Sequence, residues 1–140
     1  MRILGIDPGD RRVGLAVSDE LGITAQGLET FDKKSGVDFF DAIMDLVRRY
    51  NITAIVVGHP LHMSGESGLS GEKAEKLAEE LQERVGIQAI LWDERLSSVE
   101  AKRVLRGSRA KKGTADRLAA VIILQSYLDF LGGSAKLGKE

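Results

Sequence analysis

The sequence predicts an α/β fold with one mixed sheet and helices on both of its faces. Three strand-like runs follow one another at residues 3–7, 13–18 and 24–31, with links short enough for hairpins. Helical and strand patterns then alternate along the rest of the chain. Residues 54–57 are apolar without alternation, which is typical of a parallel strand covered on both faces. These observations predict a three-stranded antiparallel meander extended by two parallel strands.

Helical spacing identifies the covering elements. Ser35 is expected to open a helix whose apolar face runs to Tyr50, since its apolar residues recur every three or four positions. A second amphipathic helix, with apolar residues in register over 74–85, follows a loop at 61–70 and ends at Gly86. A further short strand is expected at residues 87–92.

Two helices are expected to complete the chain. Ser97 and Glu100 form a capping box that opens a helix to about Leu105. The last helix is expected to begin at Gly113 and Thr114 and to end near Leu131. We therefore expect a single domain over residues 1–131, followed by a flexible tail over residues 132–140.

Composition narrows the class of protein. The chain has 140 residues, of which 43% are apolar and 29% charged, as in a globular domain of ordinary composition. It has no cysteine, which excludes disulfides, thiolate metal sites and cysteine nucleophiles. Its longest apolar run, residues 118–124, is too short to cross a bilayer, and the N-terminus lacks a signal-peptide core. We expect a cytoplasmic protein with no membrane partner.

The N-terminal strand carries the most informative residue of the chain. An apolar run ends at Asp7, Gly9 forms a turn, and a second apolar run begins at Val13. A carboxylate at the end of a buried strand is costly unless a metal or another cation compensates its charge. The pattern Asp-x-Gly-x-x-x-x-Gly holds a divalent metal in nucleases of the ribonuclease H type and nucleotide phosphate in the actin and sugar-kinase group. A third interpretation is a hairpin in which these residues only shape the turn.

Other acids are expected near Asp7. If the strands at residues 3–7, 54–57 and 87–92 are parallel neighbours, their carboxyl ends share one edge, where open α/β sheets bind ligands. This brings the pair Asp93 and Glu94 to the same edge, and the pattern alone does not choose between them. Asp116 lies in the first turn of the last helix, where an acid also favours a helix N-terminus for purely structural reasons.

Four motifs resemble one family along essentially the whole chain. They are Asp7-Pro-Gly with Gly14, Val57-Gly-His-Pro-Leu61, Asp93-Glu-Arg-Leu-Ser-Ser98, and Asp116 with Ala119-Ala-Val-Ile-Ile-Leu-Gln125. Together they look like the YqgF family, also called RuvX, a Holliday junction resolvase-like and pre-16S rRNA nuclease family. The resemblance implies a ribonuclease H-like fold and metal-dependent phosphodiester hydrolysis in maturation of the 5′ end of 16S rRNA. Less directly, through the RuvC group, it implies cleavage of four-way DNA junctions.

The resemblance also implies the site residues. It assigns Asp7, Glu94 and Asp116 as catalytic residues and metal ligands, and it favours Glu94 over Asp93. Hydrolysis of a phosphodiester adds negative charge to an anionic centre, which two divalent ions about 4 Å apart can stabilise. Mg²⁺ or Mn²⁺ is the expected cofactor, since carboxylates and phosphate supply the oxygen ligands that such ions prefer. The chain departs from the family at His59 and His62, where Leu and Asn are usual.

Basic residues predict the substrate. The net charge of −1 conceals a segment, residues 102–117, that has seven basic residues and one acid. Such a local excess suits a polyanion bound on one face. The resemblance implies that this polyanion is structured RNA, namely pre-16S rRNA or the small-subunit precursor that contains it, or else branched DNA. The expected substrate-binding residues are Arg11, Arg12, Arg95, Arg106, Arg109, Lys111 and Lys112.

Alternative functions remain open at this point. One is a nucleic-acid-binding assembly factor with the same fold and negligible hydrolysis. Another is a nucleotide phosphate binder of the actin type, which the length and the lack of a second phosphate motif disfavour. His59 and His62 are three residues apart, but two histidines without a third ligand are weak evidence for zinc.

Overall fold

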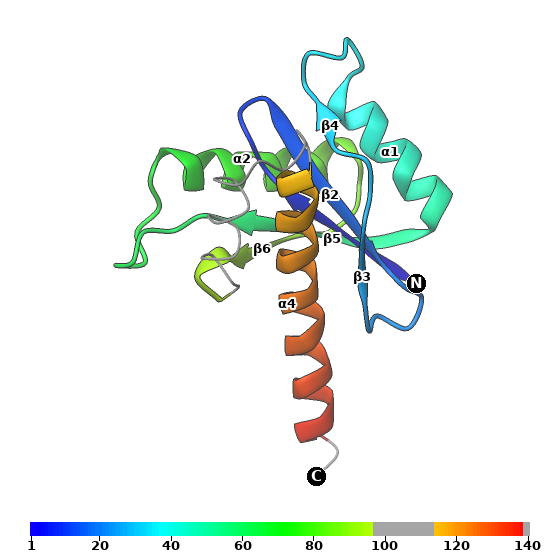
Figure 1. The fold of residues 1–140 in the computed structure, drawn as a ribbon, viewed down its shortest axis with the longest axis vertical. Coiled ribbons are helices and arrows are strands. Elements are labelled where there is room, and N and C mark those ends of the chain that lie inside the picture. The colour runs from blue at the N-terminus through cyan, green and yellow to red at the C-terminus, as the bar shows by residue number, and fades with distance from the viewer. Residues whose placement is uncertain (97–113, 139–140) are drawn as a thin grey trace.

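The computed structural model describes residues 1–96 and 114–138, with only the backbone at 114, 115 and 133–138. One sheet lies at its centre, in the strand order β3-β2-β1-β5-β6 (Figure 1). β1 pairs antiparallel with β2, and parallel pairs join β1 to β5 and β5 to β6. The strands are β1 (Arg2–Asp7), β2 (Arg12–Ser18), β3 (Ala25–Gly27), β5 (Ile52–His59) and β6 (Ala89–Asp93). The predicted mixed sheet is confirmed.

The third predicted strand, residues 24–31, is divided in the structure. β3 pairs antiparallel with the C-terminal half of β2, and β4 (Phe31–Asp32) pairs with its first two residues. The register shifts by one residue between the pairs Ala16–Gly27 and Val13–Phe31. Such a shift leaves a residue unpaired and interrupts the ladder, which is why one continuous strand does not form.

Helix α1 (Phe39–Tyr50) begins four residues later than the predicted start at Ser35. Gly36 has φ +86°, a left-handed conformation that a helix cannot contain. Asp38 is the N-cap, and its carboxylate accepts a hydrogen bond of 3.1 Å from the backbone N–H of Asp41.

Helix α2 (Leu69–Arg84) follows β5 and a turn that includes a bridge between Leu61 and Ser67. Gly86, with φ +81°, lies just beyond the end of this helix, as the sequence predicts.

The C-terminal helix α4 (Thr114–Gly138) extends past the expected end at Leu131, and its last turns project beyond the sheet (Figure 1). The predicted helix end near Leu131 was therefore wrong, since the helix continues through residues 132–138. Two consecutive glycines at 132 and 133 each cost about 1 kcal/mol of helix propensity relative to alanine, but no proline follows to remove a backbone donor. The helix predicted between Ser97 and about Leu105 lies outside the described residues.

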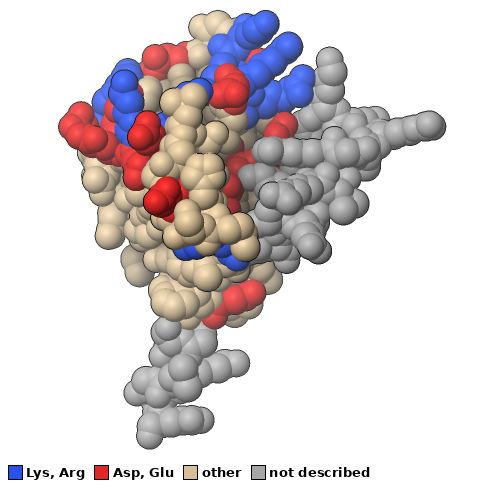
Figure 2. Space-filling model, turned by 90° about the vertical axis from the view of Figure 1, so that its left-hand side faces the viewer, with Lys and Arg blue, Asp and Glu red and all other residues tan. Residues whose placement is uncertain are grey.

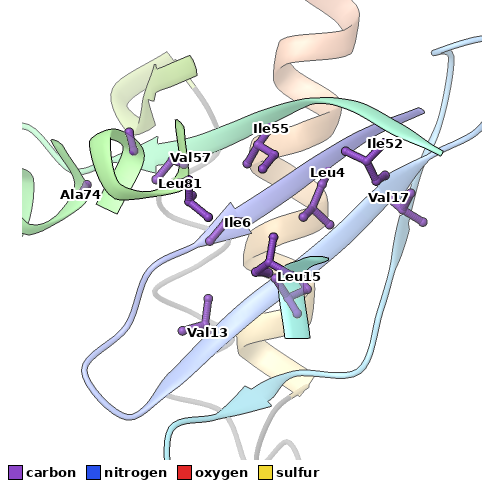
Figure 3. Close-up of a cluster of buried hydrophobic side chains, with 12 residues drawn as sticks. Leu4, Ile6, Val13, Leu15, Val17, Ile52, Ile55, Val57, Ala74 and Leu81 are labelled. Carbon is purple, nitrogen blue, oxygen red and sulfur yellow. The ribbon is translucent and has the colours of Figure 1, made fainter. Parts of the chain in front are cut away.

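Helices cover both faces of the sheet, as predicted. α1 and α2 enclose the larger core with alternate residues of the central strands, among them Leu4, Ile6 and Ile55 (Figure 3). α4 covers the opposite face, where Ala120 and Leu124 form a smaller cluster with β2. In the described part of the chain, no helix is both long and apolar enough to cross a membrane.

Candidate active site

Asp7 is the last residue of β1, and its side chain is only 2% exposed. Side chains alternate along a strand, and Leu4 and Ile6 point into the core beneath α1 and α2. Asp7 therefore faces the other side, the one covered by α4. The structure therefore places a buried carboxylate at the end of β1, on the face covered by α4.

Gly14 is the residue through which Asp116 approaches Asp7. Gly14 pairs with Asp7 across β1 and β2. A Cβ atom on Gly14 would lie 3.3 Å from the Asp7 Cβ and would overlap the carbonyl oxygen of Asp116. The first turn of α4 thus packs directly onto Gly14 of β2, beside the end of β1, and the absence of a side chain at position 14 permits this approach.

Glu94 reaches the same face from β6. It begins a 3₁₀ turn, η1 (Glu94–Leu96), directly after the strand. Its Oε1 atom lies 3.0 Å from the position that a Cβ of Gly58 would take. Gly58 follows Val57, the partner of Ile6 in the parallel pair of β1 and β5. Asp7, Glu94 and Asp116 therefore stand around one edge of the sheet, on the face covered by α4.

Asp93 has a different environment from its neighbour Glu94. It pairs in register with His59, whose Nε2 lies 3.6 Å from the carboxylate of Glu75 in α2. Asp93 thus belongs to the α2 side of the sheet. Its carboxylate accepts a 2.7 Å hydrogen bond from Nη2 of Arg95, and this side-chain hydrogen bond is the main reason that the pKa of Asp93 lies below its usual value.

The turn that carries Glu94 is attached to both faces of the sheet. On the α2 face, Nη1 of Arg95 donates to the carbonyl oxygen of Met63 at 3.2 Å. On the α4 face, the Ser126 hydroxyl donates to the carbonyl oxygen of Leu96 and accepts a hydrogen bond from Trp92 Nε1, both at 3.1 Å. The position of Glu94 is thereby tied to α4, the helix that carries Asp116.

Sequence reasoning missed Ser126 and the Met63 carbonyl. Both lie about thirty residues from the turn they hold, and neither belongs to a local pattern. A hydroxyl on a mostly apolar helix was the one available signal for Ser126, since such a group needs a hydrogen-bond partner when it is partly buried.

The predicted cations are found in different surroundings. Arg11, in the β1–β2 turn, is about half exposed and has its Nε 3.9 Å from Asp32, while Arg12 opens β2. Figure 2 shows Lys and Arg side chains gathered at the top of the molecule, at the height of this turn, with acidic side chains among them. Arg106, Arg109, Lys111 and Lys112 lie outside the described residues.

The side chains around the site determine which metal ion it could hold. Over residues 1–96 and 114–138, no three His, Asp or Glu side chains gather closely enough to hold one ion by themselves. The described histidines accordingly form no zinc site, and His59 instead lies beside Glu75. The three acids at the sheet edge offer oxygen donors only, and one is buried. This set suits a hard divalent ion that keeps waters and substrate oxygens among its ligands.

Solved structures define the class of fold. RuvC from Thermus thermophilus in complex with a Holliday junction superposes with a TM-score of 0.56 at 19% identity, over 95% of this chain and 96% of that chain. The fowlpox virus Holliday junction resolvase superposes with a TM-score of 0.50 at 11% identity, over 93% of this chain and 99% of that one. The chain thus has the α/β fold of the ribonuclease H-like resolvases.

Sequence comparisons identify the family. The model of the family described as "RuvX: Holliday junction resolvase" matches residues 1–130. A Bacillus cytotoxicus protein named "Putative pre-16S rRNA nuclease" is 47% identical over 135 residues, which cover 92% of this chain and 98% of that protein. A Syntrophus aciditrophicus protein of the same name is 47% identical over 133 residues, 92% of this chain and 89% of that protein. The chain belongs to the RuvX family, whose named members are nucleases, enzymes that hydrolyse phosphodiester bonds.

Proposed function

We propose that this chain is a divalent-metal-dependent endonuclease that processes the 5′ end of pre-16S rRNA in the cytoplasm. The observation that carries the proposal is the placement of Asp7, Glu94 and Asp116 around one edge of the sheet, in the family of the named pre-16S rRNA nucleases. The three acids lie around the same edge without gathering closely enough to hold an ion by themselves, so a metal bound there would take water and substrate oxygens as further ligands and would compensate the carboxylate charges.

Each acid has a defined part in this proposal. Asp7, Glu94 and Asp116 hold Mg²⁺ or Mn²⁺ together with water and a substrate phosphate. The bound ion supplies Lewis-acid stabilisation of the charge that develops on the phosphate. The burial of Asp7 and the two attachments of the η1 turn keep the carboxylates in place, so that substrate binding needs little reorganisation of the protein.

Cations beside the acids position the substrate backbone. Arg11 and Arg12 lie in or next to the turn that follows Asp7, which suits contact with phosphates on either side of the cleaved bond. Arg95 differs from them, because its guanidinium already binds Asp93 and the Met63 carbonyl. We assign Arg95 a positioning role that it exerts through the η1 turn, in addition to the substrate contact expected from the sequence.

A cleavage assay tests the proposal. The purified protein is incubated with a pre-16S rRNA fragment that contains the 5′ precursor segment, with Mg²⁺ or Mn²⁺ and with EDTA. Cleavage near the mature 5′ end that EDTA abolishes is the expected result. Binding of the fragment without cleavage in either metal would instead identify a non-catalytic assembly factor.

A four-way DNA junction is the second substrate to test, because the family description names Holliday junction resolvase activity. A linear duplex of the same sequence is the matched control. Faster cleavage of the junction than of the rRNA fragment would indicate that branched DNA is the substrate. The three acids would still be the proposed metal ligands.

A further inference from the structure

A cleft of about 780 Å³ lies on the face opposite α4, the other face of the sheet from the one to which we assign the three acids. Its apolar lining comes from the N-terminal part of α1, from β4 and from α2, and includes Phe31, Phe39 and Leu77. The rings of Phe31 and Phe39 meet edge to face with their centroids 5.2 Å apart. The volume falls within the range of roughly 300–1,000 Å³ that is usual for small-ligand sites.

Three lysines and three acids also line this cleft, and only some of them form ion pairs. Asp10 is 3.3 Å from Lys73, and Asp38 is 3.9 Å from Arg84. Within the described part of the chain, the lining residues Lys33, Lys76 and Glu80 form no ion pair. The lining as a whole carries three positive and three negative charges, and Lys33 and Lys76 are the cations above the apolar floor that remain for a ligand.

The cleft opens at the sheet edge that carries the acids. Pro8 and Gly9, the two residues after Asp7, line it, and so does Pro60, which follows the end of β5. A nucleic-acid strand bound at Asp7 on one face can therefore pass over the β1–β2 turn and enter the cleft on the other face. Figure 2 shows Lys and Arg side chains at the top of the molecule, with acidic side chains among them.

We propose that this cleft binds one unpaired nucleotide of a single-stranded segment that flanks the cleavage site. The base lies on the apolar floor near Phe39, and its flanking phosphates contact Lys33 and Lys76. Single-strand sites combine these two features, aromatic or apolar surface for the base and cations for the backbone. The inference rests on the proposed nuclease function, because it makes the cleft an extension of the substrate path.

Binding is measured in EDTA, so that the result does not depend on cleavage. The probes are an RNA duplex with blunt ends and the same duplex with a single-stranded extension at either end, labelled with 2-aminopurine in the extension. The test variant is Lys33→Glu with Lys76→Glu. The control is Lys34→Glu, a neighbouring exposed lysine that does not line the cleft.

The expected result is that the double variant binds the extended duplex roughly tenfold more weakly, with a salt slope reduced by about 0.7 for each lost phosphate contact. Blunt duplex binding and the control variant should change little, and the wild type alone should quench the 2-aminopurine. An equal loss for both duplexes, or no loss for either, would overturn the cleft as a single-strand site. Displacement of 2-aminopurine RNA by low millimolar ATP would overturn its assignment to an RNA strand in favour of a free nucleotide.

These outcomes are distinct from failure of the proposed function. A protein that binds no RNA of either form would contradict the nuclease proposal itself. Metal-dependent cleavage of the rRNA fragment by the double variant at saturating substrate would support the nuclease proposal, even if the binding data overturn the cleft as a single-strand site.

Discussion

At the scale of single residues, the buried carboxylate of Asp7 is the group on which the proposed activity most depends. Asp7→Asn keeps the shape of the side chain and removes its charge. We expect cleavage to fall by about a hundredfold or more, since a metal ligand contributes several kcal/mol to stabilisation of the transition state. The melting temperature without metal checks that the variant remains folded. Cleavage at the wild-type rate with subsaturating metal would remove Asp7 from the ligand set.

The neighbours Asp93 and Glu94 provide a second test at this scale. They face opposite sides of the sheet, and only Glu94 lies beside Gly58 on the face covered by α4. Glu94→Gln should therefore reproduce the loss of cleavage caused by Asp7→Asn, whereas Asp93→Asn should retain at least about a tenth of the activity. The initial rates of the two variants, measured at equal metal concentration, check this order, and its reversal would move the ligand to Asp93.

The sequence predicted much of this residue-level picture. An acid at the end of a buried strand and an acid pair after a second parallel strand were enough to place Asp7 near Asp93 and Glu94. The choice between the last two came from the family resemblance, because strand alternation alone does not say where β6 ends and η1 begins. Gly14 and Gly58 could not be assigned their packing roles, since these depend on how closely α4 and Glu94 approach the sheet.

At the scale of elements, substitutions in and around the η1 turn distinguish two roles for Arg95. It can position Glu94, or it can contact substrate phosphate. Arg95→Ala releases both Asp93 and the Met63 carbonyl. If Arg95 positions Glu94, kcat should fall about tenfold or more with little change in KM, because a small displacement of a catalytic group has a large cost. If Arg95 mainly contacts substrate phosphate, KM should rise and the salt slope of binding should fall. Ser126→Ala, which loosens the turn from the other face, should reproduce the first pattern and not the second.

The same contact predicts a pH dependence of stability. Because Arg95 lowers the pKa of folded Asp93, the stabilisation is fully present above the unfolded value near 3.8 and is lost as the pH falls through the lower folded pKa. The difference in unfolding free energy between wild type and Asp93→Asn should therefore shrink as the pH falls below 3.8. Chemical denaturation over this range measures it. Asp45→Asn, which removes an exposed carboxylate of α1, is the control for a general charge effect.

Element boundaries show where sequence patterns stop being decisive. The strand predicted over residues 24–31 divides because of a one-residue register shift against β2, which no property of that segment alone reveals. The sequence predicted a helix start at Ser35, but the left-handed Gly36 excludes that start, and Asp38 is the N-cap. The mixed α/β character of the sheet followed from the alternation of strand and helix patterns, which is a property of whole elements and is less sensitive to single residues.

At the scale of the whole molecule, the basic segment of the sequence provides a test of substrate binding. Replacement of Arg109, Lys111 and Lys112 by alanine should weaken RNA binding for every sequence tested, and each lost phosphate contact should lower the salt slope by about 0.7. Cleavage at saturating RNA should change little, because the three acids remain. Titrations at several salt concentrations measure both quantities, and an unchanged slope would show that these cations do not contact the backbone.

Trp92 gives the molecule a built-in optical probe. It is the one tryptophan among the 140 residues, and its indole lies between the strand that leads to Glu94 and the helix that carries Asp116. Its ring meets those of Tyr127 and Phe130 in α4, each with a centroid distance of 5.3 Å. Any shift of α4 against β6 alters the polarity around this ring and the hydrogen bond of its N–H. The intrinsic fluorescence of the unlabelled protein therefore follows the relative movement of two proposed catalytic elements, separately from turnover.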